Sequence, residues 1–319
     1  MILILTNKYD ISADYVTNIL HKKKYEFLRI NSEDIINKKV SIELPEFTYT
    51  IQSKEKIFNI NKNLNSVWFR RPGKPFEFEP LERQPEKPIM TYIENQWHIF
   101  LESLLSIDHV YWMNNPMNNH IAENKIYQLK IANKLGFKIP KSCITNDLQI
   151  LNEFLKSLNK EIIAKSLYLP LIEYAEKDYF IFTNIIETIN DIKKEELSLS
   201  PVIFQEYLKQ KIDYRVTVVG DTCFSVRIEF KNNKIPVDWR TYKNNIRFKK
   251  TDLPSDIINK CIKLVKYFSL NFGAIDLVES KDDFYFLEIN PNGEWGWLQT
   301  EANLPIAETI VQYLARGLK

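Results

Sequence analysis

The sequence predicts a mixed α/β (α+β) protein in which a small α/β unit precedes two units of strands and helices. The chain opens with an apolar strand, a helix and a second strand, which is a β-α-β beginning. Apolar runs of strand length recur in its C-terminal part. Its 319 residues, 45% hydrophobic and 26% charged, suit two or three globular units.

The first unit is expected to span residues 1–117. Its strands are predicted at 2–6, 26–30, 66–70 and 111–114, and its helices at 12–22 and 89–106. Five prolines between Pro72 and Pro88 predict an exposed loop. Asn115-Pro116 begins a helix predicted to run to Leu135, where Gly136 ends it.

Two further units follow, at residues 118–200 and 201–319. In the second unit, strands at 161–165 and 179–182 flank a loop at 166–178. The third unit is predicted to hold strands at 202–208, 214–219 and 223–230, a helix at 254–271, a hairpin at 275–287 and a closing helix at 304–314.

The predicted hairpin carries the strongest functional signal. Glu288 and Asn290 lie two residues apart and therefore point to the same face of a strand. The turn Ser280-Lys-Asp-Asp283 folds this strand back, which places Asp276 opposite Leu287 or Glu288. Two carboxylates and an amide oxygen suit Mg²⁺, which commonly sits on such ligands and on nucleotide phosphates. The alternative is a solvated acidic hairpin, but the apolar run 284–287 indicates burial, and a buried carboxylate needs a partner.

Two lysines are candidates for binding the phosphates of a nucleotide. Lys165 ends an apolar strand, and a buried ammonium needs an anion. Lys125 lies near the start of a helix, where a surface lysine is the simpler interpretation.

The segment Gln205-Glu206-Tyr207-Leu208 follows an apolar strand and leads to Asp213. Such a segment can offer backbone groups to an adenine edge and a carboxylate to the ribose, although any strand end could look similar. Arg215 and Arg227 lie on the next two strands and suit phosphate or carboxylate recognition, with a structural ion pair as the alternative for each.

Charge, hydrophobicity and cysteine content indicate which partners and compartment to expect. A net charge of +2 gives no indication of a nucleic-acid partner. No apolar stretch reaches transmembrane length, so no membrane role is expected. The three cysteines have no zinc-ligand spacing, which favours a reducing cytoplasm.

Taken in order, Lys125, Lys165, Gln205-Glu206, Arg215, Asp276 and Glu288-Ile-Asn290 resemble the ATP-grasp superfamily over about residues 115–316. The segments Val67-Trp-Phe-Arg-Arg-Pro72, Val237-Asp-Trp-Arg240 and Glu288-Ile-Asn-Pro-Asn-Gly-Glu-Trp295 are similar to graspetide synthetases of microviridin type. Phe27-Leu-Arg-Ile-Asn31 is similar to the start of grasp-with-spasm maturases.

This resemblance implies an ATP-grasp fold behind an N-terminal pre-ATP-grasp domain. It implies that ATP binds at the two lysines and the 205–208 hinge, that two Mg²⁺ ions bind at Asp276, Glu288 and Asn290, and that the enzyme is a homodimer. The substrate is then a ribosomal precursor peptide that docks on the central unit. Its Asp or Glu side chains become acyl phosphates, which Ser, Thr or Lys side chains capture. Arg215 stabilises the transferring phosphoryl group, while Asp238 and Arg240 orient the peptide.

One feature departs from the family pattern. The loop at 166–178, expected to cover the phosphates, contains no glycine, so its backbone is less suited to that role. A peptide-binding protein without catalysis therefore stays open as an alternative. A ligase of free amino acids or of a protein C-terminus also stays open, because ATP-grasp chemistry is compatible with it.

Overall fold

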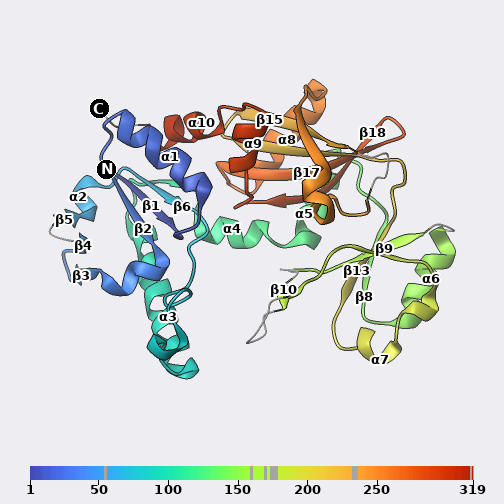
Figure 1. The fold of residues 1–319 in the computed structure, drawn as a ribbon, viewed down its shortest axis with the longest axis horizontal. Helices are drawn as coiled ribbons and strands as arrows, with labels where there is room; N and C mark the ends of the chain where they lie inside the picture. The colour runs from blue at the N-terminus through green and yellow to red at the C-terminus, as the bar shows by residue number, and fades with distance from the viewer. Residues whose placement is uncertain are drawn as a thin grey trace.

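The described part of this chain forms five β-sheets, whose arrangement Figure 1 shows. The computed structural model describes residues 1–53, 56–158, 161–168, 171–172, 179–231, 236–316 and 318, and the side chains of all of these except 242–244. Short 3-10 helices at Ser32–Asn37, Leu81–Arg83, Ser103–Ser106, Ile189–Asp191 and Trp239–Asn245 connect the longer elements.

The N-terminal sheet is parallel and has the strand order β2-β1-β6-β7. Its members are β1 (Ile2–Thr6), β2 (Phe27–Asn31), β6 (Ser66–Phe69) and β7 (Tyr111–Met113), with α1 (Ile11–Lys22) as the first crossover. Every residue of β1 is buried, as expected for a central strand covered on both faces. Asp10 starts α1, because its side chain accepts a hydrogen bond from the Ala13 amide. These elements confirm the predicted β-α-β beginning.

A second, antiparallel sheet was not predicted. It consists of β3 (Lys39–Glu43), β4 (Thr48–Ser53) and β5 (Lys56–Asn59), followed by the short helix α2 (Ile60–Asn63). Its strands are only half buried and rich in polar residues, so the hydrophobic pattern that signals a strand is weak here.

The helix expected over 89–106 is α3 (Lys87–Glu102), and it ends in a 3-10 turn. Although α3 has sixteen residues, Leu101 is its one buried side chain. It protrudes from the N-terminal part (Figure 1).

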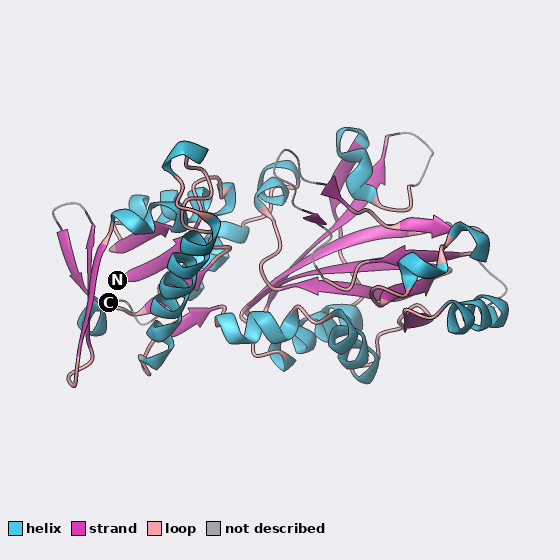
Figure 2. Ribbon diagram, turned by 90° about the horizontal axis from the view of Figure 1, so that it is seen from below, coloured by secondary structure: helices cyan, strands magenta, loops and turns pink. Residues whose placement is uncertain are grey.

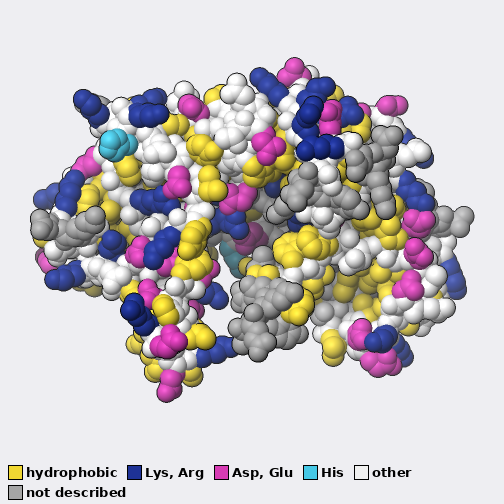
Figure 3. All heavy atoms as spheres, viewed as in Figure 1, with side chains coloured by type: hydrophobic (Ala, Val, Ile, Leu, Met, Phe, Trp, Pro, Cys, Tyr) yellow, Lys and Arg dark blue, Asp and Glu magenta, His cyan; other side chains and the backbone are white. Residues whose placement is uncertain are grey.

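Figure 3 shows basic and acidic side chains interspersed over the visible face of the molecule, where the residues are described.

The prediction of one helix from 115 to 135 is wrong, because two helices occupy this range. α4 (Pro116–Ala122) ends before Glu123, and α5 (Lys125–Lys134) begins after Asn124. The Asn124 side chain accepts a hydrogen bond from the Tyr127 amide and caps the second helix. Gly136 follows α5 with a φ of 85° and donates to Asn133 O, which confirms it as the end of the helix.

The central sheet is antiparallel, in the order β12-β9-β13-β8. It contains β8 (Ser142–Thr145), β9 (Ile162–Lys165), β12 (Asn184–Ile186) and β13 (Val202–Glu206), packed on α6 (Leu148–Leu158) and α7 (Lys194–Leu197). The strand expected at 179–182 is shorter, since β11 (Tyr179–Phe180) pairs instead with β10 (Leu171–Ile172). Residues 169–170 and 173–178 of the expected phosphate-covering loop lie outside the described residues.

The C-terminal sheet has five antiparallel strands in the order β16-β15-β14-β17-β18. They are β14 (Ile212–Val219), β15 (Thr222–Phe230), β16 (Ile246–Lys250), β17 (Phe272–Ser280) and β18 (Asp283–Asn290), joined by α8 (Ser255–Tyr267). Helices lie along one side of this sheet (Figure 2), where α8 packs on β14, β15 and β17, and α5 packs on β18.

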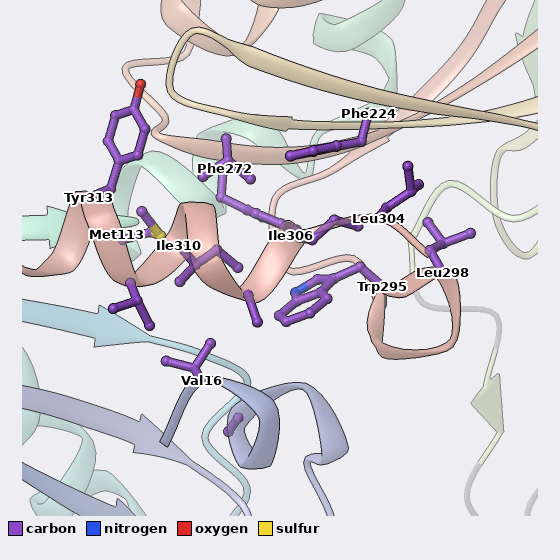
Figure 4. Packing of buried hydrophobic residues seen from close by; sticks show 14 of the residues in the cluster. Val16, Met113, Phe224, Phe272, Trp295, Leu298, Leu304, Ile306, Ile310 and Tyr313 are labelled. Atoms are coloured by element: carbon purple, nitrogen blue, oxygen red, sulfur yellow. The ribbon is translucent and has the colours of Figure 1, made fainter. Parts of the chain in front are cut away.

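A shared core joins the C-terminal sheet to the N-terminal sheet. The last helices, α9 (Gly296–Glu301) and α10 (Ile306–Leu314), lie between the two sheets, and α10 packs on α1. Figure 4 shows Trp295, Ile306 and Ile310 pointing into this layer between Phe224 and Val16. The chain therefore returns at its end to the N-terminal sheet, as its red and blue ends show in Figure 1.

None of the described helices combines the length and the apolar character that a membrane span requires.

Candidate functional site

A cavity of about 550 Å³ lies between the central and C-terminal sheets. With the exception of Arg227, the candidate residues named from the sequence line it: Lys125, Lys165, Gln205, Glu206, Tyr207, Leu208, Asp213, Arg215, Asp238, Arg240, Asp276, Glu288 and Asn290. These residues come from both sheets, α5 and the loop before β16.

A row of charged side chains crosses the C-terminal sheet at the cavity. Arg215 on β14 pairs in register with Asp276 on β17, and Asp276 pairs with Glu288 on β18. The register shifts after Asp276, so that Leu287 is an extra residue opposite the Asp276/Leu277 step. This bulge brings Glu288, rather than Leu287, opposite Asp276 and turns the two carboxylates to one face. Of the two partners expected for Asp276, the structure selects Glu288.

The row is compact. Arg215 Nη1 donates to Asp276 Oδ1 at 2.9 Å, and Lys125 Nζ lies 3.6 Å from Glu288 Oε2. The Asn290 side chain lies beside Glu288, with its Nδ2 atom 3.4 Å from Oε1. Arg227, the other arginine considered, lies 3.8 Å from Glu229 and does not line the cavity. Arg227 and Arg215 each form an ion pair, but Arg227 lies away from the cavity that Arg215 lines.

Burial and neighbouring charge act in opposite directions on the two carboxylates. Burial raises the pKa of Asp276 to about 6, against the opposing effect of Arg215. Burial also acts to raise the pKa of Glu288, but Lys125, Arg240 and Lys165 together outweigh it and hold that pKa below its usual value. The site therefore keeps one carboxylate charged and makes the other easier to protonate.

Lys165 projects from the end of β9 into the same cavity. Its Nζ atom donates to Gln205 Oε1 at 3.0 Å. Burial lowers the pKa of Lys165 to about 8, while Glu288 acts to raise it. The Lys125 ammonium also donates to the Ser166 carbonyl at 3.0 Å. Two cations thus reach the cavity from α5 and β9, on the side facing the carboxylates.

The segment 205–208 forms the edge between the two sheets. Gln205 and Glu206 are the last residues of β13, so this strand is two residues shorter than expected. The Tyr207 amide donates to Glu161 O, and Glu206 Oε1 accepts from the Lys141 amide. Asp213, on β14 beyond this edge, is buried and pairs with Lys211 at 2.8 Å. Burial raises the pKa of Asp213, although Lys211 opposes this.

Asp238 and Arg240 form a closed pair at the cavity wall. The Arg240 side chain donates twice to the Asp238 carboxylate, at 2.9 and 2.6 Å. Burial opposes the charge of Arg240, but its hydrogen bonds with Asp238 raise its pKa above the ordinary value. The guanidinium also lies 5.6 Å from the Phe180 ring centre. Asp238 therefore holds Arg240 in one orientation.

Four further residues at the cavity were not chosen from the sequence. Arg71 and Glu294 form an ion pair on the N-terminal side, Lys211 partners Asp213, and Gln128 lies against β18. A signal existed for Lys211, since it lies only two residues before Asp213, just ahead of β14. Arg71 and Glu294 are 223 residues apart, and no local pattern connects them.

The donor set fits a Mg-nucleotide. Asp276, Glu288 and Asn290 supply hard oxygen atoms on one face, and two lysines approach the same space. Within the described ranges, no three or more His, Cys, Asp and Glu side chains form a metal-binding cluster. Arg215 Nε and Asp213 Oδ2 are buried and have no hydrogen-bond partner among the described residues, which leaves polar capacity for a ligand.

Comparison with known proteins identifies the family and the fold. Residues 122–314 match the model of the RimK-like ATP-grasp domain. No curated protein sequence matches the chain. The macrocyclase MdnC from Microcystis aeruginosa, bound with the precursor peptide MdnA, has a TM-score of 0.86 at 23% identity, over 99% of each chain.

A RiPP-associated ATP-grasp ligase of Chryseobacterium gregarium, in complex with ADP and a leader and core peptide, has a TM-score of 0.85 at 28% identity, over 100% of this chain and 97% of that chain. The ATP-grasp ligase PsnB, complexed with minimal precursor, Mg and ADP, has a TM-score of 0.79 at 18% identity, over 100% and 97%. These likenesses confirm the mixed α/β ATP-grasp fold over the whole chain. The matched domain covers more than half of the sequence, and the chain belongs to the RimK-like ATP-grasp family.

Proposed function

We propose that this protein is an ATP- and Mg²⁺-dependent peptide cyclase that links side chains within a ribosomal precursor peptide. The observation that carries the proposal is the row Arg215, Asp276 and Glu288, set opposite Lys125 and Lys165 in one cavity. The full-length likeness to ligases solved with precursor peptides supports a peptide as the substrate.

The residues fit the two chemical steps of such a reaction. A carboxylate oxygen of the peptide attacks the γ-phosphorus of ATP, the bond to the β-phosphate oxygen breaks, and ADP leaves. A Ser or Thr hydroxyl, or a Lys amine, then attacks the acyl carbon, and phosphate leaves with the proton of the nucleophile. Ester or amide rings result, with the loss of one water per bond.

Each charged group has a place in these steps. Lys125 and Lys165 hold the phosphates, and Arg215 stabilises the transferring phosphoryl group through its free Nε side. Bound Mg²⁺, for which we propose two ions on Asp276, Glu288 and Asn290, supplies neutralisation of phosphate charge. The clamped Arg240 orients the reacting carboxylate of the peptide, and Asp238 fixes Arg240.

The nucleotide base is assigned to the edge between the sheets. Gln205, Glu206, Tyr207 and Leu208 contact the adenine, and Asp213 contacts the ribose. The peptide docks on the central unit, at residues 118–200, with the C-terminal unit, 201–319, holding the nucleotide and residues 1–117 forming the pre-ATP-grasp domain.

Co-expression with the small peptide encoded beside this gene tests the function. We expect the peptide to lose the mass of one water per bond with the unaltered protein, and none with Glu288→Gln. Glu279→Gln is the matched control, because Glu279 lies on β17, bonds to the Tyr214 hydroxyl and does not line the cavity. Unchanged peptide mass with the unaltered protein, for every acidic small peptide encoded nearby, would remove the proposal.

A ligase of free amino acids or of a protein C-terminus is the second candidate, because the matching family model is RimK-like. Phosphate release with free amino acids and no peptide would favour it. The whole-chain likeness to peptide macrocyclases favours the first candidate.

Two properties of the whole protein are also proposed. A homodimer is supported by α3, which exposes Ile89, Tyr92 and Ile99. Light scattering should give twice the chain mass, and Ile99→Glu should give the monomer. A cytoplasmic location is supported by three free cysteines, Cys143, Cys223 and Cys261; secretion of the native protein into the medium would contradict it.

A further inference from the structure

Gln128 makes a three-point contact with main-chain groups near the carboxylate row. It lies on α5, one turn after Lys125, and its side chain is 2% exposed. Its Nε2 atom donates to Ile289 O at 2.9 Å, and its Oε1 atom accepts from Ile289 N at 3.0 Å. The same Nε2 atom donates to Ala122 O at 2.6 Å, at the end of α4.

The contact involves the main chain of the residue between the two proposed metal ligands of β18. Ile289 separates Glu288 from Asn290, so the main chain held by Gln128 carries the proposed metal ligands on both sides. β18 is the last strand of its sheet and pairs on its inner side with β17. On its outer edge, the described residues form one isolated bridge, between Tyr285 and Lys138, nearer the start of the strand than Ile289. Gln128 thus takes the place of a further strand at the outer edge, with the donor and acceptor pattern of a backbone amide.

The next residues of the chain are held in the same manner. Asn114 Nδ2 donates to Pro291 O at 3.1 Å, and Arg70 Nη1 donates to Asn292 O at 2.5 Å and to Gly293 O at 3.2 Å. Buried side chains from outside the C-terminal sheet therefore fix successive carbonyl groups of the segment that follows the ligands. Gln128 is the one that acts between the ligands themselves.

We propose that Gln128 is a positioning residue for the Mg²⁺ site, and this inference rests on the proposed function. By fixing both main-chain atoms of Ile289, it sets how the Glu288 carboxylate and the Asn290 amide face each other. It also connects them to α5, whose Lys125 lies 3.6 Å from Glu288. Groups that orient metal ligands in this way affect metal affinity although they never touch the ion.

The test separates this role from a simple contribution to stability. The affinity for ADP is measured by calorimetry with saturating Mg²⁺ and with EDTA, and the ratio of the two reports how strongly the ion and nucleotide bind together. Gln128→Met keeps the length of the side chain and removes its amide. Ser66→Ala is the control, because the buried Ser66 hydroxyl donates to Leu314 O, far from the cavity.

Gln128→Met is expected to lower the ratio by about 10- to 100-fold, with ADP affinity in EDTA nearly unchanged. Ser66→Ala should lower the melting temperature and leave the ratio unchanged. If Gln128→Met does not fold, Gln128→Asn, whose amide is one methylene shorter, should show the same fall. An unchanged ratio in the folded variant overturns the positioning role alone, whereas failure of the unaltered protein to bind Mg-ADP refutes the proposed function.

Discussion

Removal of the Arg70 side chain should destabilise the protein far more than loss of an ordinary ion pair. The guanidinium is 1% exposed and lies 3.4 Å from Asp10, whose side chain is also 1% exposed, and 2.9 Å from Glu294. In Arg70→Met, Asp10 keeps its bonds to the Thr6 hydroxyl and the Ala13 amide but loses its buried counter-charge. The carbonyl groups of Asn292 and Gly293 lose their donor as well.

The expected cost is about 3–5 kcal/mol, the usual result of leaving a buried charge unpaired. The loss in free energy of unfolding is measured by urea unfolding followed by tryptophan fluorescence. Trp68 and Trp295 are suitable probes because both are buried in the core between the N-terminal and C-terminal sheets. Asp10→Asn keeps the helix cap and removes the charge. In that background Arg70→Met should cost about 1–3 kcal/mol less.

Two results would refute this reasoning. A cost of less than about 1 kcal/mol for Arg70→Met would show that the Arg70–Asp10 pair stabilises the protein no more than an exposed salt bridge does. Equal costs in the two backgrounds would show that the Asp10 charge is not the source of the loss. The Arg71–Glu294 pair is exposed, and Arg71→Met is the matched control, with an expected effect within about 0.5 kcal/mol.

Three further predictions concern the cavity and the backbone. Burial lowers the pKa of Lys165 to about 8, so its ammonium group loses its charge as the pH rises through 8. The affinity for ADP should therefore fall roughly tenfold from pH 7 to pH 9. Lys165→Arg, measured by the same calorimetry, should remove this pH dependence. Asp238→Asn weakens the two-point contact with Arg240, and we expect a higher KM for the peptide with Mg-ADP affinity unchanged; a change in ADP affinity instead would contradict the assignment of Arg240 to the peptide. Gly220 has a φ of 58°, and an added Cβ would lie 1.9 Å from the Tyr313 ring. Gly220→Ala should therefore lower the free energy of unfolding, measured in urea, by about 1–3 kcal/mol. A neutral effect would show that the Tyr313 ring can move away.

Local sequence patterns predict the hairpin, which the structure confirms, and the candidate ligand residues that it carries. Residues two apart on a strand share a face in any fold, so Glu288 and Asn290 were certain to lie together once the strand was recognised. The strand pattern around Gly220 and the end of α5 at Gly136 likewise follow from local rules. The order of Lys125, Lys165, Gln205-Glu206, Arg215, Asp276 and Glu288-Ile-Asn290 also suggests the family.

Contacts between residues far apart in the sequence depend on how the sheets and helices pack together. The bulge at Leu287 chose Glu288 as the partner of Asp276, since strand patterns do not reveal an extra residue. α4 and α5 are separated at Asn124, which caps α5, and Gln128 then contacts both Ala122 and Ile289. The contact with Ile289 depends on where the C-terminal sheet lies, which helix propensity cannot foresee. The local sequence predicts Arg70 only as the end of a strand. Its side chain is buried because the C-terminal segment folds back onto the N-terminal sheet. Burial depends on which segments pack together, and local sequence does not determine that.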